Sequence, residues 1–138
     1  MKTYPSNSPE AMARIVAMTM ITDARLDDRE LDIMERLHFY QLLGLGKRAF
    51  SQVVQDYCAD LLAAGTPDGR IDLMDQASID AIVDAVDDPA KRAVMANMLL
   101  NIVKADGFFH DAELALFRYV LERWDISFDE IRRAAGAA

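Results

Sequence analysis

The sequence has little cysteine, proline or glycine, and each shortage excludes a class of protein. A single cysteine leaves no framework of intrachain disulfides. The 4 prolines and 6 glycines exclude collagen-like and low-complexity chains. No apolar run is long enough for a membrane span, and residues 1–8 contain no basic-then-apolar leader. We therefore expect one cytoplasmic domain over residues 1–138, with an ordered core over about residues 9–135.

Basic residues are also in short supply. The 15 Lys+Arg stand against 23 Asp+Glu, which sets the formal net charge at −8. A surface of this sign repels phosphate groups, so general nucleic-acid binding is disfavoured. The hydrophobic content of 52% is too high for a disordered chain. The composition predicts a folded, acidic protein that has no nucleic-acid partner.

Apolar residues recur at helical rather than alternating spacing, as in the stripe Met95, Met98, Leu99 and Ile102. Ser8–Pro9 and Asp88–Pro89 are signals for an N-cap followed by a first-turn proline. Helices are expected over residues 9–22, 27–44, 47–64, 74–86, 89–105 and 111–124, and a short one from residue 127, where Ser127 precedes Glu130 by three residues. With short connections between them, these helices predict an all-α, compact bundle of about seven helices.

One nine-residue segment occurs twice. Residues 23–31 read DARLDDREL and residues 106–114 read DGFFHDAEL, identical at four of nine positions. Each copy follows one apolar helix and precedes another, which predicts an internal pseudo-repeat of helical hairpins. A looser third copy over residues 68–75 is better explained as an ordinary turn before a helix.

Each copy places an Asp between two helices and a Glu in the first turn of the second helix. If the hairpins pack about a pseudo-twofold axis, these carboxylates converge, and at about 4–6 Å each pair repels by roughly 1–3 kcal/mol. A divalent cation would relieve that repulsion: oxygen ligands favour calcium, magnesium or manganese, and a histidine ligand favours manganese or zinc. The candidate ligands are Asp23, Asp27, Glu30, Asp106, His110 and Glu113. The alternative is that these acids only cap helices or face solvent.

The two acidic motifs resemble those of the tellurite-resistance TerB-like family, whose fold is also found in the DjlA co-chaperones. The resemblance rests on residues 23–30 and on Ala105-Asp106-Gly107 followed by Glu113, and it extends over about residues 10–135. It implies a bundle of about seven helices built from a duplicated hairpin, with no established catalytic activity. It also implies that Asp23, Glu30, Asp106 and Glu113 are the metal ligands, and it associates the chain with a stress response.

Other chemistry-bearing residues have simpler explanations. His38 is expected to be a partly buried histidine, and Cys58 a core or boundary residue with no activating neighbour. The methionines are expected to fill irregular core space rather than to form a binding groove. Phe108 and Phe109 are adjacent aromatics in a loop, so one of them is a candidate partner contact.

Three functions follow from this sequence, in order of preference. The first is a noncatalytic TerB-like module that binds a divalent cation and acts in stress response or as an adaptor. The second is a metal-independent interaction domain with an acidic surface, which binds a protein partner or forms a homodimer. The third is an enzyme that uses the carboxylates as general acid and base, or as a di-metal hydrolase. The di-metal form is disfavoured because Glu35 and His38 form the only Glu-x-x-His pair.

Overall fold

The structure, a computed structural model, describes residues 4–20, 28–63, 76–104 and 111–127. These ranges contain seven helices and no strand, so the all-α prediction is confirmed for them. The helices are α1 (Pro9–Met20), α2 (Asp28–Arg36), α3 (Phe39–Leu43), α4 (Lys47–Ala63), α5 (Gln76–Asp84), α6 (Pro89–Lys104) and α7 (Asp111–Arg123). None of the described helices is long and apolar enough to cross a membrane.

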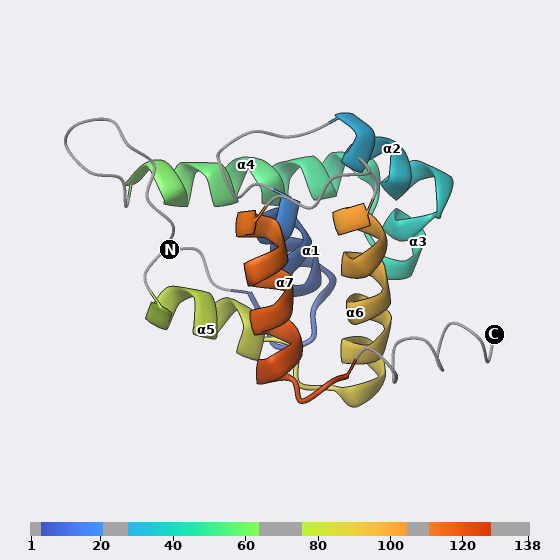
Figure 1. Ribbon diagram of the computed structural model, residues 1–138. Helices are drawn as coiled ribbons and strands as arrows, with labels where there is room; N and C mark the ends of the chain where they lie inside the picture. The colour runs from blue at the N-terminus through green and yellow to red at the C-terminus, as the bar shows by residue number, and fades with distance from the viewer. Residues whose placement is uncertain (1–3, 21–27, 64–75, 105–110, 128–138) are drawn as a thin grey trace.

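Helix α1 lies at the centre of the bundle. It packs against α3, α4, α5, α6 and α7, and Figure 1 shows it behind α7, with α4 running across one end of the α6–α7 pair. Every residue from Ala11 to Met20 is buried, including Arg14 and Thr19. The Thr19 hydroxyl donates a hydrogen bond to the Ile15 carbonyl 3.0 Å away, which satisfies that polar group inside the core.

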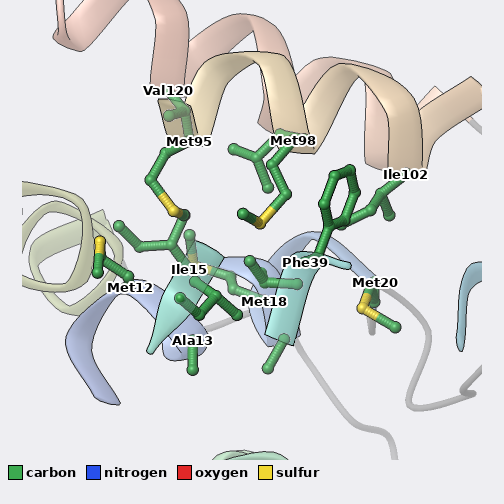
Figure 2. Close-up of a cluster of buried hydrophobic side chains, with 14 of the residues drawn as sticks. Met12, Ala13, Ile15, Met18, Met20, Phe39, Met95, Met98, Ile102 and Val120 are labelled. Atoms are coloured by element: carbon green, nitrogen blue, oxygen red, sulfur yellow. The ribbon is translucent and has the colours of Figure 1, made fainter. Parts of the chain in front are cut away.

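The apolar stripe read from the sequence, Met95, Met98, Leu99 and Ile102, lies in the core. Figure 2 shows Met95, Met98 and Ile102 of α6 pointing toward the side chains of α1, with the Phe39 ring beside Ile102. Six methionines of the described residues are at most 6% exposed: Met12, Met18, Met20, Met34, Met95 and Met98. The prediction that methionines fill the core is therefore confirmed for these six.

Two of the predicted helix starts carry the expected caps. The backbone N–H of Ala11 donates to the Ser8 hydroxyl at 3.1 Å, and Pro9 is the first residue of α1. At α6, the N–H of Ala90 donates to the Asp88 carboxylate at 3.2 Å. The predicted cap at Asp27 and the helix expected to start near residue 127 lie outside the described residues.

The prediction of one continuous helix over residues 27–44 is wrong. The chain turns at Leu37 and His38, where His38 adopts the left-handed conformation with φ 57°, and α3 begins after it. In a continuous helix, Phe39 would lie roughly 140° around the axis from buried Met34. The turn shifts the register so that both side chains reach the core. Gly44 then ends α3 with φ 80°, a conformation that glycine adopts without strain.

Candidate functional site

Most of the predicted ligands lie outside the described residues. This applies to Asp23, Asp27, Asp106 and His110, and to the two predicted partner contacts, Phe108 and Phe109. Glu30 and Glu113 fall in described helices, each as the third residue, in α2 and α7 respectively. Their side chains are outside the description, so the structure positions the backbone of these two candidates only.

The helices that follow the two acidic motifs share a neighbour. Both α2 and α7 pack against α6, and Figure 1 shows the starts of α2 and α7 toward the same end of the bundle as the last turn of α6. The chain runs along α6 toward that end and returns along α7. The first turns of α2 and α7 carry Glu30 and Glu113. They therefore lie toward the end of the bundle where α6 ends, and both helices pack on α6.

The described side chains offer no other metal site. Within the described ranges, no group of three or more His, Cys, Asp or Glu side chains is placed to hold an ion. Glu35 of the single Glu-x-x-His pair forms an ion pair with Lys47 instead. That contact raises the pKa of the Lys47 ammonium, chiefly through its hydrogen bond to Glu35.

The burial predicted from the sequence is confirmed for Cys58 and is wrong for His38. Cys58 is half-buried against the core, as expected. Burial raises the pKa of its thiol, which lowers the thiolate fraction and opposes a nucleophilic role. His38 is exposed, so the expectation of a partly buried histidine is wrong. His38 lies in the left-handed turn between α2 and α3 and not within either helix, which accounts for its exposure.

A polar network between α5 and α7 was missed by sequence reasoning. The Arg123 guanidinium donates from Nε and Nη2 to the two carboxylate oxygens of Asp84, each at 2.7 Å. One turn earlier, the Tyr119 hydroxyl donates to Asp80, and this bond is the main reason that the pKa of Tyr119 is raised. Acids four residues apart on one helix thus meet partners four residues apart on another. The spacing can be read within each helix, but no signal in the sequence pairs the two helices.

Side chains from three separate segments of the chain form hydrogen bonds to the backbone at the end of α5 and in the turn after it. The Trp124 indole N–H donates to the Val83 carbonyl at 3.1 Å, and Arg92 Nε donates to the Val86 carbonyl at 2.7 Å. From the other end of the chain, Asn7 accepts the backbone N–H groups of Asp87 and Asp88 on its side-chain oxygen. These bonds satisfy backbone groups at the ends of two helices, so we assign the cluster a structural role.

Arg14 is the most unusual charged residue of the core. It is 4% exposed, although its neighbours in α1 are mostly apolar. The centre of its guanidinium lies 4.9 Å from the centroid of the Tyr4 ring, a cation–π distance. Burial lowers the pKa of Arg14, while the nearby Tyr4 and Asp60 act in the opposite direction. The signal for it in the sequence was an isolated charge within an apolar helix.

Comparisons of the chain with protein-family models, with curated proteins and with solved structures returned no match. The function is therefore argued from the residues and the packing of the helices.

Proposed function

We propose that the protein is a noncatalytic, TerB-like module that binds a divalent cation through its two acidic segments and acts in stress response or as an adaptor. The observation that supports the cation site is the packing of α2 and α7 on the same helix, α6. Each of these two helices begins at one copy of the repeated acidic motif.

The position of the two glutamates favours their charged form. A carboxylate in the first turn of a helix is stabilised by the partial positive charge of the unpaired N–H groups there. Glu30 and Glu113 both occupy such a position. A cation between the two segments would draw its ligands from these glutamates and from Asp23 and Asp106. An all-oxygen set of this kind suits calcium, magnesium or manganese.

The noncatalytic part of the proposal is supported at the single cysteine. The raised pKa of Cys58 opposes thiolate chemistry.

The acidic composition supports the adaptor role in the proposal, because a net charge of −8 favours association with basic partners and disfavours anionic ones. The adaptor role would then consist of cation-dependent presentation of an acidic surface.

Metal titration tests the proposal. Calcium, magnesium, manganese and zinc are added to chelator-treated protein while the melting temperature is followed. An ion at 100 times its dissociation constant adds about 2.7 kcal/mol, which is roughly 8–11 °C for a chain of this size. The double variant Asp106→Asn, Glu113→Gln should lose the shift. Glu122→Gln, an exposed glutamate at the other end of α7, serves as the matched control and should keep it.

A melting temperature that no ion changes would refute the cation site. Retention of the full shift in the double variant would refute these ligands in particular. In the first case the alternative function, a metal-independent interaction domain, becomes the preferred one.

A further inference from the structure

The chain before α1 is fastened to a turn that lies far along the sequence. The backbone N–H of Asn7 donates to the Ala85 carbonyl at 2.7 Å. The side-chain oxygen of Asn7 accepts the N–H groups of Asp87 and Asp88 at 2.9 and 3.1 Å, and its side-chain nitrogen donates to the Asp87 carboxylate at 2.5 Å. Asn7 has φ 61°, a left-handed conformation that asparagine adopts more readily than most residues. Together these bonds clip residue 7 to the turn between α5 and α6.

Three residues before this clip, the Tyr4 ring covers one side of the Arg14 guanidinium. The centre of the guanidinium lies over the ring, 4.9 Å from its centroid. Arg14 is 4% exposed, and it is the one charged residue that is buried among those the structure describes. The ring therefore separates this guanidinium from solvent on that side.

A short turn joins the contact at Tyr4 to the clip at Asn7. The N–H of Ser8 donates to the Pro5 carbonyl at 3.2 Å, and the proline ring fixes the backbone angle φ of residue 5. We call residues 4–8 the N-terminal strap. Because only this turn separates Tyr4 from Asn7, displacement of Asn7 moves the ring as well. No residue of the strap is fully buried, so the strap can open at a lower free-energy cost than unfolding of the bundle.

We infer that the N-terminal strap is a lid over Arg14 and that the clip at Asn7 keeps this lid closed. The turn between α5 and α6 thereby controls solvent access to a guanidinium on α1, the helix at the centre of the bundle. The inference does not involve the two acidic motifs and is independent of any cation.

Labelling of arginine side chains with phenylglyoxal, measured for each peptide by mass spectrometry, tests the inference on the full chain. Arg118 of α7 is exposed and serves as the internal reference. We expect Arg14 to react at least tenfold more slowly than Arg118. Tyr4→Ala removes the ring, and Asn7→Gly removes the side-chain bonds of the clip while glycine tolerates the left-handed backbone. Each variant should raise the labelling rate of Arg14 at least fivefold.

Ser6→Gly is the matched control, because Ser6 is an exposed residue of the strap that is not part of the clip. It should leave the Arg14 rate within twofold, and all three variants should keep the circular dichroism spectrum of the native protein. Equal rates for Arg14 and Arg118, or an Arg14 rate that Tyr4→Ala leaves unchanged, would overturn the lid. An Arg14 rate that Asn7→Gly leaves unchanged, or that Ser6→Gly raises equally, would overturn the role of the clip.

The dependence of the labelling rate on urea distinguishes opening of the strap from unfolding. A local opening exposes little surface, so the Arg14 rate of the native protein should stay constant at urea concentrations below the unfolding transition. A rate that rises with urea as steeply as the unfolded fraction would overturn the inference, since only the unfolded chain would then react.

Discussion

Replacement of Trp124 by phenylalanine tests how the end of α5 is held on α7. Trp124 is 4% exposed, and its indole N–H donates to the Val83 carbonyl at 3.1 Å. That carbonyl belongs to the last turn of α5, where its other donor, the N–H of Val86, lies at a longer 3.4 Å. The phenyl ring removes the indole donor and part of the buried ring while it preserves an aromatic face for Arg92, which lies 5.7 Å from the ring centroid.

The expected loss of unfolding free energy follows from these two changes. A lost hydrogen bond costs about 1 kcal/mol. The missing ring atoms correspond to two or three methylene groups at about 0.8 kcal/mol each. We expect Trp124→Phe to destabilise the protein by about 3 kcal/mol and to lower the melting temperature by about 9–12 °C.

Urea unfolding followed by far-ultraviolet circular dichroism measures this loss, since Trp124 is the only tryptophan and the variant has no indole fluorescence. The midpoint should fall with an unchanged denaturant slope. Tyr119→Phe on the same helix is the control, because its hydroxyl bonds to Asp80 in a more exposed setting, and its loss should be smaller. A loss for Trp124→Phe below about 1 kcal/mol would refute the assigned role of the indole.

Three further predictions concern the backbone, a cap and the thiol. Gly44→Ala should cost about 1–2 kcal/mol in urea unfolding, because φ is 80° while the nearest atom that a Cβ would meet, Pro9 Cγ, lies at an ordinary 3.7 Å. His38→Gly should instead gain about 0.5–1 kcal/mol, because relief of the left-handed strain at φ 57° exceeds the entropy cost of glycine, and equal effects of the two would contradict the backbone argument. Ser8→Ala should lose about 1 kcal/mol in the same assay through its bond to Ala11, and full stability would show that the cap is dispensable. Cys58 should be alkylated near neutral pH more slowly than an unstructured cysteine peptide, with its rate rising at higher pH because burial raises the thiol pKa; a rate equal to that of the peptide would refute this.

Periodicity and capping chemistry were sufficient to predict most of the helices. The helices expected over residues 47–64, 89–105 and 111–124 correspond to α4, α6 and α7, because a helix with one buried face repeats its apolar residues every three or four positions. Their ends followed from local signals, such as Asp88–Pro89 at α6. Both kinds of information are local, so they can be read from the sequence without knowledge of the tertiary structure.

The break at His38 required information that a local pattern does not state directly. Histidine is no strong helix breaker, and the apolar content of residues 27–44 is high enough for a single helix. The signal was a change of register, since Met34 and Phe39 do not share a face of one straight helix. Which of the two arrangements forms depends on what the side chains pack against, here the core around α1 and α6.

Long-range polar pairs were beyond the reach of sequence reasoning for a similar reason. Asp84 and Arg123 are 39 residues apart, and nothing in either helix alone selects the other. The candidate ligands are a different case. Their convergence was predicted from the repeated motif and stays a prediction, since the described residues show only that α2 and α7 both pack on α6.

The burial of α1 on all sides has a consequence for biosynthesis. The helix ends at Met20, whereas α6, which covers much of it, begins at Pro89, about 70 residues later. At a translation rate of about 5–20 residues per second, α1 waits roughly 3–14 s for that neighbour after it is made. An almost wholly apolar segment that is left uncovered for seconds would be exposed to aggregation or to chaperones during synthesis. Rapid early docking of α4 would be the alternative means by which the nascent protein escapes aggregation.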